Sequence, residues 1–173
     1  MSNLNVADLL KTVATELKRH LQQTGIEKPL MIGIHTGGVW IAKQLHRELG
    51  LEEPLGTLNI SFYRDDFTRI GVHPQVKPSR LPVTVENRHI ILVDDVLQTG
   101  RTIRAALNEI FDYGRPASVT LAVLVDRSGR ELPVEPTVTG THLELDARQQ
   151  IKLEGPEPLR LILLEPELPV TQE

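Results

Sequence analysis

The stretch ILVDDVLQTGRT, residues 91–102, is the most informative part of this sequence. It begins with an apolar run that stops at two adjacent carboxylates, Asp94 and Asp95. A run that is apolar on both faces is typical of a central strand in a parallel sheet. The segment TGRT, residues 99–102, comes next, and apolar residues then recur at helical spacing to about residue 112. The stretch therefore predicts a buried strand, a polar loop and a helix.

Strands and helices alternate along the rest of the chain, which predicts an α/β fold with a mainly parallel central sheet flanked by helices. One helix is expected between Asn5, which can cap it, and Gly25, and another is expected to end at Gly50. The expected strands are 29–35, 56–63, 88–95, 117–125 and one within 158–170. Residues 64–85 fit no period, and a loop of this length in a compact domain is usually functional or mobile. We expect a single domain over residues 1–173.

Composition excludes several classes of protein. The chain has no cysteine, so disulfides, thiolate metal sites and a cysteine nucleophile are excluded. Aromatic residues make up 3%, which argues against a platform that stacks single-stranded bases. A net charge of −4 argues against a surface devoted wholly to nucleic acid. The N-terminus reads as neither a signal peptide nor a membrane span, so a cytoplasmic protein is expected.

Polar loops follow several of the expected strands, where the ligands of open α/β sheets bind. Backbone N–H groups at the start of the helix after Gly100, together with the hydroxyls of Thr99 and Thr102, can bind a phosphate. Asp94 and Asp95 repel a phosphate, but they suit hydroxyl groups or a divalent cation. A ribose 5-phosphate offers this combination, with its phosphate on the loop and its vicinal hydroxyls on the acids.

Residues 91–102 resemble the 5-phosphoribosyl diphosphate (PRPP) motif of type I phosphoribosyltransferases, which has an apolar strand, two acids and a Thr-Gly phosphate loop in this order. The segments FYRDD, DYGRP and LAVLVDRSGRELP resemble the pyrimidine operon regulatory protein family, PyrR, and the resemblance covers residues 30–133. It implies the type I phosphoribosyltransferase fold, with a flexible loop at about 64–85. It also implies a small hood at about 126–150 plus the C-terminal strand.

The resemblance implies a role for each matching residue. The expected catalytic residues are Asp94 and Asp95, which would hold the ribose hydroxyls, and Arg64, which would be the cation for the leaving diphosphate. Asp126 and Arg127 would lie next to the nucleobase. The residues that would bind PRPP are Thr36, Gly37, Gly38, Asp94, Asp95, Val96, Gln98, Thr99, Gly100, Arg101 and Thr102. Mg²⁺ would arrive with PRPP near the acid pair, without a dedicated protein site.

The sequence departs from the family pattern at three places. His35 and Gly37 stand where the diphosphate loop of the family carries a basic residue and an arginine, so another cation must contribute or diphosphate binds more weakly. Residues 126–132 read Asp-Arg-Ser-Gly-Arg-Glu-Leu where the family has Asp-Arg-Gly-His-Arg-Glu-Leu. Residues 140–145 lack a lysine that the family often has there. The missing histidine and lysine bear more on RNA binding than on catalysis.

The expected function is a uracil phosphoribosyltransferase, which makes UMP and diphosphate from uracil and PRPP and also regulates pyrimidine nucleotide biosynthesis genes. The expected partners are PRPP, uracil, UMP or UTP and a pyrimidine mRNA leader, within a homo-oligomer and without a membrane. Two alternatives stay open: a non-catalytic RNA-binding attenuation regulator that senses UMP or UTP, and a phosphoribosyltransferase for a purine base. A response-regulator receiver is excluded because its acid pair ends the first strand, and the glycine motifs of P-loop and Rossmann proteins are absent.

Overall fold

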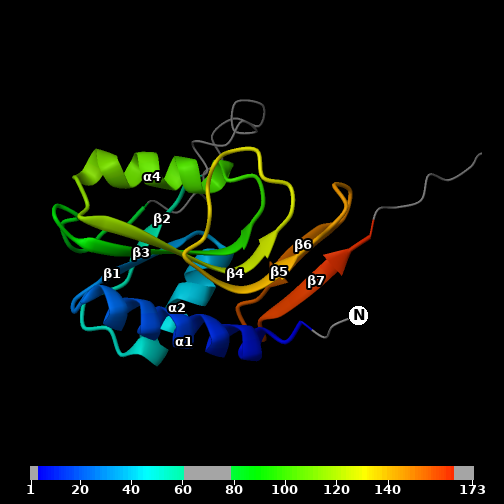
Figure 1. Ribbon diagram of the computed structural model, residues 1–173, viewed down its shortest axis with the longest axis horizontal. Helices are drawn as coiled ribbons and strands as arrows, with labels where there is room; N and C mark the ends of the chain where they lie inside the picture. The colour runs from blue at the N-terminus through cyan, green and yellow to red at the C-terminus, as the bar shows by residue number, and fades with distance from the viewer. Residues whose placement is uncertain (1–3, 61–78, 166–173) are drawn as a thin grey trace, which may run out of the picture.

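A computed structural model describes residues 4–60 and 79–165, in which a five-stranded parallel sheet lies between helices (Figure 1). The sheet contains β1 (Leu30–Ile34), β2 (Gly56–Leu58), β3 (His89–Leu97), β4 (Ser118–Arg127) and β5 (Val138–Leu143), in the spatial order β2-β1-β3-β4-β5. Helices α1 (Val6–Thr24) and α2 (Gly37–Leu49) cover one face, and α4 (Arg101–Tyr113) covers the other. The predicted fold class is confirmed.

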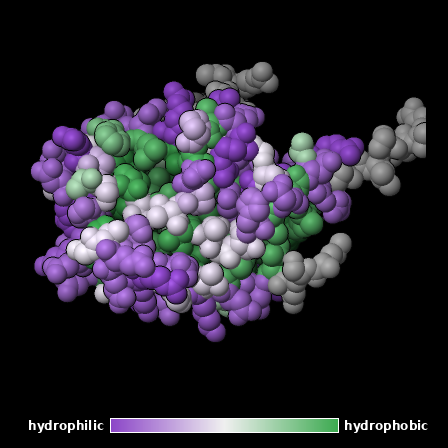
Figure 2. Space-filling view, in the orientation of Figure 1, coloured by the Kyte–Doolittle hydropathy of each residue, from purple (hydrophilic) through white to green (hydrophobic). Residues whose placement is uncertain are grey.

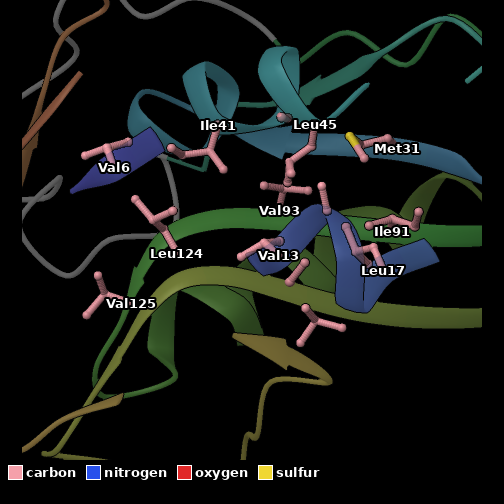
Figure 3. Close-up of a cluster of buried hydrophobic side chains, with 14 of the residues drawn as sticks. Val6, Val13, Leu17, Met31, Ile41, Leu45, Ile91, Val93, Leu124 and Val125 are labelled. Atoms are coloured by element: carbon pink, nitrogen blue, oxygen red, sulfur yellow. The ribbon is translucent and has the colours of Figure 1, made fainter. Parts of the chain in front are cut away.

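The two faces of the sheet follow from the alternation of side chains along each strand. Met31, Ile91 and Val93 point toward α1 and α2 and belong to one buried cluster (Figure 3). Their neighbours Ile32 and Leu92 point the other way and pack in a second cluster with apolar residues of α4. Both faces of the central strands are therefore buried, which explains why the sequence of β3 is a continuous apolar run rather than an alternating one.

The helix ends agree with the sequence analysis. The Asn5 side chain accepts a hydrogen bond from the backbone N–H of Asp8 at 3.1 Å, which caps α1. Gly25 and Gly50 follow α1 and α2 with φ angles of 69° and 60°, in the left-handed region that favours glycine. These helix ends depend on contacts between residues that are close in the sequence, so they can be predicted from a sequence pattern.

An antiparallel hairpin of β6 (Gln150–Glu154) and β7 (Arg160–Leu164) forms a second, smaller sheet. Strand β6 contacts β3, so the hairpin stands beside the central sheet (Figure 1). Figure 2 shows hydrophobic residues at the surface of this hairpin, where Leu163 and Leu164 are 37% and 44% exposed. The hairpin therefore uses only part of its apolar surface to pack against the body of the protein.

The structure differs from the sequence analysis in three respects. Strand β3 runs on to Leu97 and does not stop at the acid pair. Strands β5 and β6 were not expected, and β5, within the range assigned to the hood, pairs with β4 in the central sheet. Arg80, within the expected loop, pairs with Thr57 beside β2 through two backbone hydrogen bonds of 2.7 and 2.8 Å. The rest of that loop, to residue 78, and the end of the 56–63 strand lie outside the described residues.

In the described ranges, no helix is both long and apolar enough to cross a membrane.

Candidate active site

The predicted site residues come from three neighbouring strands. Strand β3 pairs with β1 up to Gly33↔Val93, so the loop that leaves β1 starts beside the acid pair. On the other side β3 pairs with β4, and Leu97 stands opposite Asp126. Because all three strands are parallel, their carboxyl ends meet at one edge of the sheet. The topology therefore gathers segments that lie far apart in the sequence.

Backbone hydrogen bonds orient the two acids. The backbone N–H of Asp95 donates to Asp94 Oδ1, and the backbone N–H of Val96 donates to Asp95 Oδ1, both at 2.9 Å. Asp94 is 6% exposed, and Asp95 is half-buried. Each of these two bonds uses one oxygen of its carboxylate. Asp95 is the more accessible of the two acids for a ligand hydroxyl.

The loop after β1 packs directly on the acid pair. A Cβ atom added to Gly37 would lie 2.2 Å from Asp95 Oδ2, and one added to Gly38 would lie 2.7 Å from the backbone oxygen of Val93. The peptide bond between His35 and Thr36 is cis. Gly37 and Gly38 are among the residues predicted to bind PRPP. The structure gives a steric reason for both glycines, since a side chain at position 37 would displace the Asp95 carboxylate and one at position 38 would meet the backbone of Val93 and Asp94.

The loop of residues 98–102, which is predicted to bind the 5-phosphate and is called the phosphate loop below, leads into α4 at Gly100. Gly100 has φ of 91°, and a Cβ atom there would also lie 3.2 Å from Val134, so both conformation and space favour glycine. Helix α4 starts at Arg101, whose backbone N–H donates to the Thr99 hydroxyl oxygen at 3.1 Å. The Thr99 hydroxyl oxygen thus accepts a hydrogen bond from one of the helix N–H groups that were predicted to bind a phosphate. The hydroxyl proton of Thr99 is still available to donate.

A cavity of about 490 Å³ lies between the acid pair, the phosphate loop and the hairpin. It is lined by Asp94, Asp95, Val96, Leu97, Gln98, Thr99, Gly100, Thr102, Ile103, Ile151, Lys152 and Leu153. Seven of the predicted PRPP residues are therefore brought together. Arg101 is not in this lining, and its Nε pairs with Glu131 at 2.7 Å on the surface.

The three lining residues from β6 were missed by sequence analysis. They lie about fifty residues beyond the acid pair in the sequence. The segment IKLE alternates apolar and charged residues over too short a length to predict more than a strand. No local signal in it indicates that it faces a ligand.

Arg130 links the phosphate loop to the predicted base site. One of its terminal nitrogens donates to the backbone oxygen of Gln98, and the other donates to Asp126 Oδ1, both at 2.6 Å. The Asp126 side chain is 14% exposed, so this is a largely desolvated ion pair. Sequence analysis gave Arg130 no role. The structure makes it the residue that holds the carboxyl end of β4 against the phosphate loop.

Arg127 has contacts other than those expected. It is 3% exposed, and its guanidinium donates to the backbone oxygens of Ser128, Asp146 and Gln149. These bonds fasten the segment before β6 to the end of β4. Glu131, four residues further along the chain, pairs with Arg101 instead. The contact between Arg127 and a base stays a prediction.

His142 of β5 ties Asp126 to Glu144. Its Nε2 lies 2.8 Å from Glu144 Oε1, and its Nδ1 lies 3.3 Å from Asp126 Oδ2. The pKa of His142 is raised above its ordinary value of 6.5. The hydrogen bond to Glu144 is the largest cause of this shift, and the hydrogen bond to Asp126 is the next largest. Because the folded-state pKa is raised, the ion pairs are present in full below pH 6.5 and are lost as the pH rises through the pKa of the folded protein.

Replacing Glu144 with glutamine should therefore lower the pKa of His142, because the largest cause of the shift is removed. The pKa is measured by nuclear magnetic resonance titration of the histidine ring protons. Glu135→Gln, at an exposed position on the segment before β5, is the matched control and should leave this pKa unchanged. An equal pKa in wild type and Glu144→Gln would contradict the observed pairing.

Two expected features bear on cations. Arg64 lies outside the described residues. Within residues 4–60 and 79–165, no group of three or more His, Cys, Asp or Glu side chains gathers in a way that could hold a metal ion. The acid pair supplies two carboxylates, which are hard oxygen ligands of the kind that Mg²⁺ prefers, and they fit an ion that arrives with its own phosphate ligands.

The sequence is similar to that of a known protein family and its curated members. The phosphoribosyl transferase domain family matches residues 2–155. The bifunctional protein PyrR of Pseudomonas aeruginosa is 60% identical over 161 residues, which are 93% of this chain and 95% of that protein. That of Nitrosococcus oceani is 61% identical over 160 residues, which are 91% of this chain and 90% of that protein.

Solved structures of lower identity show the same fold. A hypoxanthine-guanine phosphoribosyltransferase of Bacillus anthracis has a TM-score of 0.64 at 17% identity, over 80% of this chain and 81% of that chain. A hypoxanthine phosphoribosyltransferase of Staphylococcus aureus has a TM-score of 0.60 at 20% identity, over 80% and 75% of the two chains. The chain belongs to the phosphoribosyltransferase family and, within it, to the bifunctional PyrR proteins.

Proposed function

We propose that this protein transfers the 5-phosphoribosyl group of PRPP to uracil, which yields UMP and diphosphate, and that it also regulates pyrimidine nucleotide biosynthesis genes. The observation that carries the enzymatic part is the cavity in which Asp94 and Asp95 stand next to the loop of residues 98–102. Carboxylates suit ribose hydroxyls, and the N–H groups at a helix start suit a phosphate. The high identity to PyrR proteins supports uracil as the base.

In the proposed reaction, diphosphate leaves C1 of the ribose, and N1 of uracil forms the new bond on the opposite face as its proton passes to the departing diphosphate. Positive charge develops on the ribose as the C–O bond breaks, and the leaving diphosphate takes the electron pair. Asp94 and Asp95 hold the ribose hydroxyls and stabilise this charge, and the phosphate loop fixes the 5-phosphate. Thr36, Gly37 and Gly38 receive the diphosphate, and Arg64 is proposed as a cation for it. Asp126 and Arg127 are proposed to lie at the base.

Mg²⁺ is proposed as the cofactor that PRPP brings to the site. The carboxylates of Asp94 and Asp95 would be its nearest protein oxygens, and the ion would offset negative charge on the diphosphate when bound. Its proposed place does not require a dedicated set of protein ligands. The protein is proposed to act in the cytoplasm as a homo-oligomer.

The experiment that tests the enzymatic proposal offers the protein a choice of bases. It is incubated with PRPP, Mg²⁺ and each of uracil, hypoxanthine, guanine and orotate, and the nucleotides are separated by chromatography. UMP from uracil alone is the expected result. A purine nucleotide would reassign the base, and no product from any base, with PRPP still bound, would favour the purely regulatory alternative.

The regulatory part is proposed to work through a pyrimidine mRNA leader and to respond to UMP or UTP. Support for it comes from the bifunctional PyrR relatives. Contacts to RNA phosphates release counterions, so the affinity for a leader transcript should fall as salt increases. Binding is measured at several salt concentrations with and without UMP. An affinity that does not depend on salt would argue against this part of the proposal.

A further inference from the structure

Lys152 is the one positively charged residue among the described residues that line the cavity. Among the described residues that line this cavity, three carry charge, namely Asp94, Asp95 and Lys152. PRPP would bring a 5-phosphate to this cavity and a diphosphate to the loop of residues 36–38, which packs against Asp95 at the edge of the cavity. The N–H groups of the phosphate loop can bind the 5-phosphate. Thr36, Gly37 and Gly38, the residues proposed for the diphosphate, contain no cationic side chain.

The strand that carries Lys152 lies close to the loop of residues 36–38. Leu153 is 4% exposed and belongs to the buried cluster that contains residues of α2. Trp40, in the first turn of α2, packs against the same cluster, and a Cβ atom added to Gly155 would lie 3.0 Å from its ring. Trp40 follows Gly38 by two residues. The hairpin is therefore docked on the start of α2, directly after the loop proposed for the diphosphate.

The ammonium group of Lys152 is also uncommitted. It forms no ion pair or side-chain hydrogen bond with any residue in the ranges 4–60 and 79–165, and its side chain is exposed. The neighbouring arginines are engaged: Arg101 pairs with Glu131, and Arg130 pairs with Asp126. A lysine on a flexible stem can turn toward an anion without breaking an existing contact.

We propose that Lys152 binds the diphosphate group of PRPP and so supplies the cation that the loop of residues 36–38 lacks. This inference rests on the proposed function, since it names a further binding residue for the same substrate. A charge-assisted hydrogen bond from an ammonium group to a phosphate oxygen is among the stronger polar contacts in proteins. Lys152 would act on the leaving group and the ground state of PRPP, whereas the acid pair acts on the ribose.

Direct titration of the folded protein tests this inference without relying on turnover. Magnesium diphosphate and, separately, UMP are titrated by calorimetry into wild type, Lys152→Met and Lys152→Arg. Lys152→Met should weaken diphosphate binding about ten-fold or more, which corresponds to the loss of one hydrogen bond to a charged group. Lys152→Arg should bind diphosphate within about three-fold of wild type, because the charge is kept. UMP carries no diphosphate, so its affinity should be nearly unchanged in both variants.

Lys43→Met is the matched control, because Lys43 is an exposed lysine in the middle of α2 and outside the cavity lining. It should bind both ligands as wild type does. In steady-state assays, Lys152→Met should raise the KM for PRPP and leave the KM for uracil unchanged.

Equal diphosphate affinity in wild type and Lys152→Met, or an equal loss for UMP and diphosphate, would overturn the inference. If wild type forms no nucleotide from any base, the proposed function fails, and the diphosphate titration still decides the role of Lys152.

Discussion

Asp95→Asn is expected to reduce kcat roughly 100- to 1,000-fold, the range seen when one preorganised charge-stabilising group is removed from an active site. Asparagine has the shape of aspartate, and its amide oxygen can still accept the hydrogen bond from the backbone N–H of Val96. The negative charge that is proposed to face the ribose is lost. Positive charge that develops at C1 in the transition state then has less compensation, so the effect falls on turnover more than on folding.

The measurement is the steady-state rate of UMP formation at saturating PRPP and uracil, with urea unfolding to compare stability. Asp112→Asn removes the same charge at an exposed position of α4 and should have the rate of wild type. Unchanged turnover by Asp95→Asn, with the control behaving as expected, would rule out the assignment of Asp95 to the ribose hydroxyls.

Gly37→Ala is expected to lower turnover by a factor on the order of 100 with little loss of stability. The added Cβ would lie 2.2 Å from Asp95 Oδ2, so the carboxylate has to rotate away. A displacement of about 1 Å in a reacting group can cost about 100-fold in rate. The clash is with the end of a side chain, which can move, and alanine is about 1 kcal/mol better than glycine inside a helix. Position 37 is the first residue of α2, so this preference offsets part of the strain.

Gly25→Ala separates strain from the effect on the site. Gly25 has φ of 69° and has no heavy atom within 4 Å of an added Cβ, so alanine there costs backbone strain of about 1–2 kcal/mol. This control should lose stability and keep its rate, whereas Gly37→Ala should lose its rate and keep its stability. The two variants are compared by urea unfolding and by UMP formation. A wild-type rate in Gly37→Ala would mean that Asp95 can leave its position without consequence.

The network around Arg130 suggests how the phosphate loop and the base site are kept in register. Arg130 contacts the backbone of Gln98 and the carboxylate of Asp126, and His142 contacts Asp126 from the next strand. Because the pKa of His142 is raised, this network gains a positive charge at a higher pH than it would with an ordinary histidine. The phosphate loop and the predicted base site are thus joined through Arg130, Asp126 and His142, none of which lines the cavity beside the acid pair.

The parts of the structure that the sequence determined are those that depend on neighbours along the chain. The PRPP motif is contiguous, so the strand, the acids and the helix start could be read in one stretch of twelve residues, 91–102. Asn5 and Gly25 bound α1 through contacts within a few residues. The apolar runs of β1, β3 and β4 predicted a parallel sheet because strands buried on both faces are typical of sheets that helices cover on each side.

The tertiary structure decided what depends on contacts between distant segments. Lys152 shares a cavity with the acid pair only because the β6–β7 hairpin docks on α2, and a five-residue strand carries too little periodicity to predict that docking. Arg127 and Arg130 lie three residues apart, yet one fastens the segment before β6 and the other fastens the phosphate loop. Which carbonyl or carboxylate each arginine meets is fixed by the packing of segments from different parts of the chain, because the side chains of neighbouring residues leave the backbone in different directions and meet different partners.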